Sequence, residues 1–212
     1  NKVAKMNQNR RPKVGFLQPA STFTHLAAMK QFGSNADYIP METYAICQEV
    51  KDSTLDYGVL AIENVFEGTV GTTMDAVLTT EDLSVVGEII LPIAHHLLSN
   101  GEISEITRIY SHQQAISQCR KNIAALEKEF GHKIEIITEA STARGAERAA
   151  QSSEKGSAAI APEIAAEQYT LNILRNHMED EKDNATRFWV LGHEELSKPS
   201  GNDKTTFSFD VE

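Results

Sequence analysis

Short apolar runs alternate with amphipathic stretches along most of the chain, and polar residues follow almost every apolar run. The clearest run, residues 57–62, is nearly continuous, as is typical of a strand covered on both faces. Strands are expected at 13–17, 38–41, 57–62, 83–92, 106–110, 133–138 and 157–161, with helices at 25–32, 45–51, 72–78, 115–130, 143–150 and 162–169. This order predicts an α/β fold with mostly parallel sheets flanked by helices.

The segments just after the predicted strands are rich in hydroxyl and amide side chains. They hold Ser21-Thr22, Glu63-Asn64, Glu67-Gly68-Thr69, Ser111-His112-Gln113-Gln114, Ser141-Thr142 and Thr186-Arg187. Open α/β sheets bind ligands at the carboxyl ends of their strands, and several of these segments also precede a helix, whose first N–H groups attract anions. The pattern predicts an uncharged, N–H-rich cradle for carboxylates, although each Ser or Thr alone fits a helix N-cap equally well.

The tripeptide Thr186-Arg187-Phe188 runs directly into the apolar strand 189–191, after a predicted helical stretch and the acidic run 179–184. A hydroxyl and a guanidinium at the mouth of a buried strand suit an anionic small molecule, which needs a proton donor and a fixed cation. An edge strand with an incidental Thr-Arg step is the alternative. Glu63 also ends a buried strand, and it fits a structural ion pair as well as a catalytic carboxylate.

Charge and composition narrow the classes of partner. The 212 residues carry a formal net charge of −10, which argues against nucleic acid, because that partner requires a basic footprint. No apolar run reaches the roughly 18–20 residues that span a bilayer, and residues 1–13 lack the apolar segment of a signal peptide. A cytoplasmic protein without a membrane partner is therefore expected. Cys47 and Cys119 are expected to be reduced and buried in helices.

Metal and nucleotide sites are not predicted. His95 and His96 are adjacent, so in an extended segment they point to different sides and cannot clamp one ion. Neither cysteine has a histidine beside it. The glycine-rich loops that cradle nucleotide phosphates, GxGxxG and GxxxxGK, do not occur. The sequence therefore predicts no cofactor and no metal.

Taken together, these segments resemble the catalytic domain of the prephenate dehydratase family from about Lys13 to Leu196. The most specific match joins residues 169–174, Asp180 and the run 186–191, and supporting matches are Thr22-Phe23 with residues 25–28, Glu63-Asn64 with Glu67-Gly68, Tyr110-Ser111-His112 with Gln114-Ala115, and Ser141-Thr142-Ala143. The chain departs from the family pattern at Gln18, Ala20 and Ser21, in a loop that usually reads Gly-Pro-Glu-Gly-Thr, and at Val65, which replaces a Ser. Thr69 replaces another Ser.

The resemblance implies conversion of prephenate to phenylpyruvate in phenylalanine biosynthesis, with loss of carbon dioxide and water and without a cofactor. It implies that Thr186 donates a hydrogen bond to the leaving hydroxyl, that Arg187 holds a carboxylate or braces the cleft, and that Phe188 packs against the ring or shields the site. The residues implied to bind substrate are Thr22, Glu63, Asn64, Thr69, Ser111, His112, Gln114, Ser141, Thr142 and Ala143. The alternatives are arogenate dehydration, decarboxylation of prephenate without aromatisation, and small-anion binding without catalysis.

The fold implied by the resemblance has two α/β lobes around a cleft, like the type II periplasmic binding proteins. Residues 13–92 and 176–196 are expected to form lobe 1 and residues 93–175 lobe 2, with a helix before Thr186 returning the chain to lobe 1. Residues 1–12 are expected to be flexible. Residues 197–212 resemble a linker and the first strand of a regulatory ACT domain that is truncated here. A homodimer or higher homo-oligomer is also expected.

Overall fold

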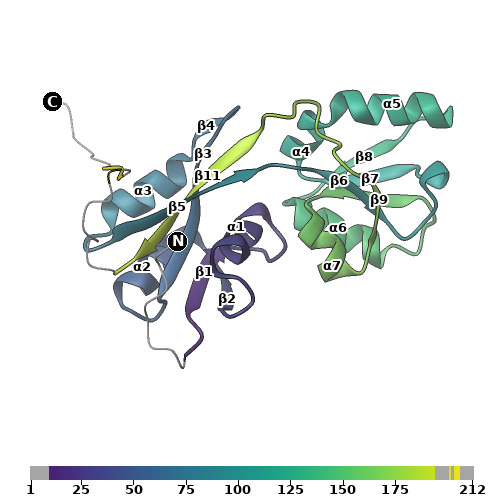
Figure 1. Ribbon diagram of the computed structural model, residues 1–212. Coiled ribbons are helices and arrows are strands. Elements are labelled where there is room, and N and C mark those ends of the chain that lie inside the picture. Colours follow the sequence, from purple (N-terminus) through teal and green to yellow (C-terminus); the bar gives the residue numbers. More distant parts are fainter. Residues whose placement is uncertain (1–9, 194–200, 202, 206–212) are drawn as a thin grey trace.

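The computed structural model describes residues 10–193, 201 and 203–205 (Figure 1). Its strands are β1 (Lys13–Leu17), β2 (Asp37–Met41), β3 (Tyr57–Asn64), β4 (Gly68–Thr69), β5 (Ser84–Pro92), β6 (His96–Ser99), β7 (Arg108–Ser111), β8 (Glu135–Thr138), β9 (Ser157–Ala161), β10 (Asn172–Arg175) and β11 (Ala185–Gly192). A six-stranded sheet has the order β2-β1-β3-β11-β5, with β4 paired to β3, and a five-stranded sheet has the order β10-β6-β9-β7-β8. We call the parts built on these sheets lobe 1 and lobe 2.

Helices cover both faces of each sheet. They are α1 (Phe23–Phe32), α2 (Thr43–Lys51), α3 (Gly71–Thr79), α4 (Gln113–Gln118), α5 (Arg120–Phe130), α6 (Thr142–Gln151) and α7 (Glu163–Tyr169), with a short 3-10 helix at Ile103–Glu105. In lobe 1, Phe188 and Val190 of β11 pack in the same core as α1, whereas Trp189 and Leu191 pack with α2 and α3. Successive side chains of a strand point to opposite faces, so α1 lies on one side of the sheet and α2 with α3 on the other.

Lobe 2 has two cores, and one of them depends on a close approach of a helix to a strand. One core holds residues of α4 and α5, and the other holds residues of α6 and α7. Helix α6 contributes small residues to its core, and a Cβ atom placed on Gly145 would lie 2.7 Å from the carbonyl oxygen of Tyr110 in β7. Only glycine therefore allows α6 to pack this closely against the strand.

The predicted α/β fold is confirmed, and the predicted parallel pairs are present between β1 and its neighbours β2 and β3 and between β7 and its neighbours β8 and β9. Each sheet also contains antiparallel pairs, which involve β11 and β5 in lobe 1 and β6 and β10 in lobe 2. The spacing of apolar residues does not carry this information, because pairing direction is set by the path of the chain between strands.

The structure corrects the predicted helix 115–130, which is two helices that meet at Cys119. The carboxylate of Asp180 accepts hydrogen bonds from the backbone N–H groups of Lys121 and Asn122 at 2.9–3.1 Å. A residue distant in sequence thus caps the start of α5, since the first N–H groups of a helix have no partner within it. Both cysteines are free and buried, as expected. Cys47 lies in α2, but Cys119 lies at the junction of α4 and α5 and not inside a helix, which corrects that part of the prediction.

A second correction concerns the segment before Thr186, which was expected to be helical. Helix α7 ends at Tyr169, and Thr170 follows with a left-handed φ of 54°. Strand β10 then pairs with β6, and residues 176–184 form no helix. The chain therefore returns to lobe 1 as an extended segment.

Two extended segments, residues 92–96 and 175–185, connect the lobes, and we call them the first and second crossings. Figure 1 shows them running together between the sheets. The N–H of Ile93 donates to the carbonyl of Asn184 at 2.9 Å, and the N–H of Met178 donates to the carbonyl of His95 at 2.8 Å. These backbone hydrogen bonds hold the first crossing beside the second. Residues 206–211 of the strand predicted for the ACT domain, and most of the segment 1–12, lie outside the described residues.

Candidate active site

Thr186 and Asn64 meet where β11 pairs with β3. The side-chain Nδ2 of Asn64 donates to Oγ1 of Thr186 at 2.9 Å and to Oδ1 of Asn184 at 2.8 Å. On its other side, Oδ1 of Asn64 accepts from the backbone N–H groups of Phe66 at 3.0 Å and Glu67 at 3.3 Å. Asn64 and Thr186 are 8% and 9% exposed, so these contacts are largely shielded from water.

A line of amide side chains continues from this pair into lobe 2, and we call it the relay. Nδ2 of Asn184 donates to Oε1 of Gln118 in α4 at 3.3 Å. The same oxygen lies 3.0 Å from Nε2 of His95, and Nε2 of Gln118 donates to Oε1 of Glu67 at 3.2 Å. The relay therefore joins β3 and β11 of lobe 1, the two crossings and α4 of lobe 2.

Backbone groups fix the direction of the relay. A backbone N–H can only donate, so the N–H groups that meet Oδ1 of Asn64 force its Nδ2 to face Thr186 and Asn184. Oγ1 of Thr186 is then an acceptor for Asn64. Among residues 10–193, Thr186 donates no side-chain hydrogen bond, so its own hydroxyl hydrogen is available to a ligand. A hydroxyl that accepts a hydrogen bond becomes a better donor, because bonds in a chain polarise one another.

Arg187 points away from Thr186, as the alternation of a strand requires. Its Nη1 lies 3.4 Å from the carboxylate of Glu63, and its Nε lies 3.6 Å from that of Glu88, on the two neighbouring strands. All three side chains are partly exposed. This geometry favours the bracing role for Arg187. Phe188 is 1% exposed in the core of lobe 1, so its ring packs inside the lobe and is not presented to a ligand.

The other residues predicted to bind substrate lie at the carboxyl ends of the strands, where several of them stabilise local structure. Oγ of Ser141 caps α6 by accepting from the N–H of Arg144 at 3.0 Å, and Nδ1 of His112 accepts from the N–H of Gln114 at 3.3 Å. The hydroxyl of Ser111, which is fully buried, donates to the carbonyl of Ile160. The remaining predicted positions are Thr22, whose hydroxyl donates to the carbonyl of Pro19 at 3.2 Å, Thr69 opposite Glu63 in β4, and Thr142 and Ala143 in the first turn of α6.

Gln118, Asn184 and His95 were not among the predicted site residues. Gln118 is four residues after Gln114, so both lie on the same face of the helix, and this spacing is the one local signal that identifies it. A cavity of about 220 Å³ lies beside the relay and is lined by residues that include Gln118, Asn184, Phe66 and Glu179. The relay thus borders open space between the lobes.

Two titratable groups flank the relay. Burial lowers the pKa of His95, which favours the neutral ring. Burial alone would raise the pKa of Glu179, but hydrogen bonds from the backbone N–H of His95 and from His177 outweigh burial and hold this pKa below its ordinary value. Glu179 therefore stays ionised beside a neutral imidazole.

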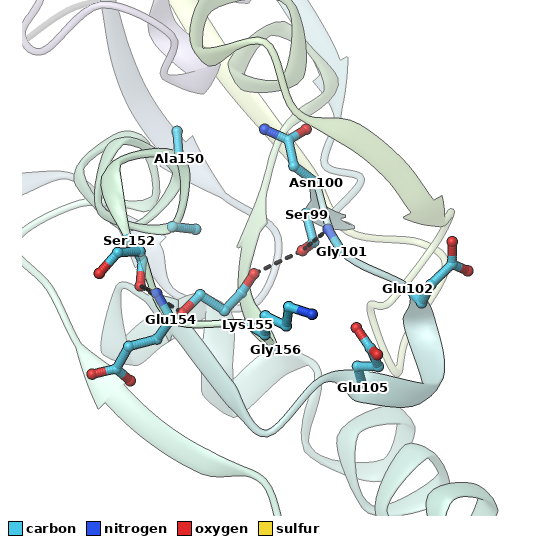
Figure 2. Close-up of a pocket in the computed structure, with 13 residues that line it drawn as sticks. Ser99, Asn100, Gly101, Glu102, Glu105, Ala150, Ser152, Glu154, Lys155 and Gly156 are labelled. Carbon is cyan, nitrogen blue, oxygen red and sulfur yellow. Dashed lines mark hydrogen bonds between the residues drawn. The ribbon is translucent and has the colours of Figure 1, made fainter.

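A larger cavity of about 380 Å³ lies elsewhere in lobe 2 (Figure 2). Its lining includes Ser99, Gly101, Lys155, Gly156 and Ser157, so it borders the start of β9. The carboxyl end of β7, which runs parallel to β9 and ends at Ser111, is at the opposite edge of this sheet. Ligands of α/β sheets bind at the carboxyl edge, so the relay is the better candidate site. The described residues contain no cluster suited to a metal ion, and none of their helices has the length and hydropathy to cross a membrane.

Comparisons with known proteins bear on this site. The sequence matches the profile of the prephenate dehydratase family over residues 14–196. The bifunctional chorismate mutase/prephenate dehydratase of Aquifex aeolicus (strain VF5) is 42% identical over 201 residues, covering 94% of this chain and 53% of that protein. The prephenate dehydratase of Bacillus subtilis (strain 168) is 35% identical over 209 residues, covering 92% and 70%.

Among solved structures, prephenate dehydratase from Arthrobacter aurescens in complex with L-Phe superposes with a TM-score of 0.78 at 32% identity, covering 89% of this chain and 63% of that chain. The chain spans about half the length of the bifunctional relatives it matches. The profile match and the curated relatives confirm the resemblance drawn from the sequence. The chain belongs to the prephenate dehydratase family.

Proposed function

We propose that this chain is the catalytic part of a prephenate dehydratase, which converts prephenate to phenylpyruvate in phenylalanine biosynthesis. The observation that carries the proposal is the direction of the bond between Asn64 and Thr186. Because Asn64 donates to Oγ1 of Thr186 at 2.9 Å, the threonine hydrogen is left for a ligand oxygen. The poor leaving group in this reaction is a hydroxyl, and it departs more easily when it accepts a hydrogen bond.

The reaction balances without a cofactor. The bond between the ring and its carboxylate breaks, its electron pair enters the ring, and the opposite carbon–oxygen bond breaks as the hydroxyl leaves as water. Prephenate dianion and one proton give phenylpyruvate anion, carbon dioxide and water. Free threonine is a very weak acid, so water supplies the net proton and Thr186 stabilises the departing oxygen in the transition state.

The carboxylates of the substrate require neutral donors in this acidic chain. Arg187 is engaged by Glu63 and Glu88 on the other face of the sheet, so it is not the group that we assign to them. The N–H groups at the starts of α1 and α6, together with the spare amide hydrogen of Gln118, are the donors that we assign to them. We further propose a cytoplasmic homo-oligomer.

The proposal is tested by incubating the protein with prephenate and following phenylpyruvate by its absorbance in alkali. Thr186→Ala is expected to lower kcat by about 10²- to 10³-fold, and Thr186→Ser, which keeps the hydroxyl, should retain most of the activity. Full activity in Thr186→Ala would remove Thr186 from the mechanism. Turnover of arogenate in place of prephenate would change the substrate, and binding without turnover would favour a small-anion binding module.

A further inference from the structure

His95 is a buried imidazole that joins the relay to both crossings. It is 2% exposed, and its Nε2 lies 3.0 Å from Oε1 of Gln118. The ring of Phe23 at the start of α1 packs against it edge to face, with 5.3 Å between ring centroids. The main chain of His95 donates to the carboxylate of Glu179 and accepts from the N–H of Met178, both at 2.8 Å. The ring is therefore fixed in place before any ligand binds.

The relay dictates which nitrogen of His95 carries the hydrogen. Nδ2 of Asn184 donates to Oε1 of Gln118, and this direction follows from the backbone groups that orient Asn64. A second neighbour of the same oxygen must also be a donor, so His95 must carry its hydrogen on Nε2. Its Nδ1 then holds a lone pair, and this atom is buried without a hydrogen-bond partner in the part of the chain that the structure describes.

We propose that His95 is a positioning residue that locks the side-chain amide of Gln118 through its Nε2–H. If that amide turned over, its NH₂ group would face two donors, His95 and Asn184. Its oxygen would at the same time face the carboxylate of Glu67, which now accepts from Nε2 at 3.2 Å. The imidazole thus keeps one face of the Gln118 amide on the relay and leaves its second amide hydrogen for the cavity between the lobes.

The first test is the tautomer of His95 in the full chain, read from long-range ¹H–¹⁵N correlations. The expected result at neutral pH is a neutral ring with hydrogen on Nε2 and none on Nδ1. Gln118→Leu removes the acceptor, so the signal of His95 should move toward a mixture of tautomers. Hydrogen on Nδ1, a doubly protonated ring, or a tautomer unchanged by Gln118→Leu would overturn the proposal. This test needs no substrate.

The second test rests on the proposed function. His95→Leu should lower kcat for prephenate about 10- to 100-fold, as expected when an active-site group is misplaced. The KM should change less than about threefold, since the N–H groups at the starts of α1 and α6 still bind the carboxylates. His95→Gln supplies an N–H of similar reach, so it should restore kcat to within about threefold of wild type.

His96→Leu is the matched control. His96 is 6% exposed and its ring lies 5.7 Å from that of His177. Its side chain makes no hydrogen bond to a residue of the relay in the described part of the chain. Its replacement should leave kcat unchanged. A folded His95→Leu protein with wild-type kcat, or an equal loss in His96→Leu, would overturn the positioning role. If the wild type fails to turn over prephenate, the proposed function fails while the tautomer still decides the role of His95. If His95→Leu does not fold, His95→Gln and the tautomer decide it.

Discussion

Asn64→Asp is the sharpest test of the direction of the relay, because the two side chains have nearly the same shape. An aspartate at position 64 still accepts from the N–H groups of Phe66 and Glu67, but it has no hydrogen to donate. Thr186 must then give its hydrogen to the carboxylate, and the donor that the leaving hydroxyl needs is lost.

The contacts set the size of the effect. Three donated bonds disappear, to Oδ1 of Asn184 at 2.8 Å, to Oγ1 of Thr186 at 2.9 Å and to the carbonyl of Ala185 at 3.2 Å. Thr186 donates one bond back to the carboxylate, so the net loss is two hydrogen bonds. At about 1 kcal/mol for each neutral hydrogen bond, the free energy of unfolding should fall by about 2 kcal/mol. Loss of one positioned donor in a transition state lowers kcat by about 10²- to 10³-fold. The variant should thus remain folded and lose nearly all activity.

The assay measures phenylpyruvate formation by Asn64→Asp, by Thr186→Ala and by the double variant, beside chemical unfolding of each. If both residues act through one hydroxyl, the double variant should be no slower than Thr186→Ala alone. Asn172→Asp adds the same charge at an exposed position of β10 and should retain full activity. Losses that multiply in the double variant, or wild-type kcat in Asn64→Asp, would refute the reasoning.

Three further outcomes follow from the geometry. Arg187→Ala should lower the free energy of unfolding by no more than about 1 kcal/mol and kcat by less than about fivefold, since its ion pairs are partly exposed and on the far face of the sheet; a loss of kcat beyond about 100-fold would contradict this. Gly145→Ala should lower the free energy of unfolding by about 1–3 kcal/mol, because its Cβ would lie 2.7 Å from the carbonyl oxygen of Tyr110. An unchanged free energy of unfolding would contradict the close approach. Glu179 has a folded pKa below its ordinary value of 4.5, so its stabilising effect is present above about pH 4.5 and is lost as pH falls through the folded pKa. The difference in unfolding free energy between wild type and Glu179→Gln should therefore shrink on acidification, and a difference that grows would show that the bond to His95 does not favour the carboxylate.

The spacing of apolar residues predicted most of the strands and helices, because this periodicity is a local property that can be read directly from the sequence. Polar residues at strand ends also pointed to Asn64 and Thr186 separately. Their contact could not be predicted, since it depends on β11 inserting between β3 and β5. The cap that Asp180 provides for α5 could not be predicted from the sequence for the same reason, because it is a contact between segments that are distant in the chain.

The pairing of Thr186 with Arg187 in one site stays a prediction, and the alternation of side chains along the strand does not favour it. Neighbouring side chains of a strand face opposite ways, so one of the two had to point away from the cleft. The hydroxyl-rich loops also stabilise local structure, because Ser111 donates to the carbonyl of Ile160 and Ser141 accepts from the N–H of Arg144. That these residues bind substrate stays a prediction. The side-chain amides of Gln118 and Asn184 form the hydrogen bond that links the relay to lobe 2, and no local sequence pattern predicts a role for Asn184.

The place of β11 in the sheet also bears on the order in which the protein assembles. The sheet of lobe 2 is built from one continuous stretch of chain, but lobe 1 needs a strand that is synthesised after lobe 2 is complete. Thr186 meets Asn64 across a separation of 122 residues. Such distant contacts form late, because the chain must lose the entropy of a long loop before they stabilise it. The proposed donor therefore reaches its place with the last strand, so a chain in which Thr186 contacts Asn64 has also completed the sheet of lobe 1.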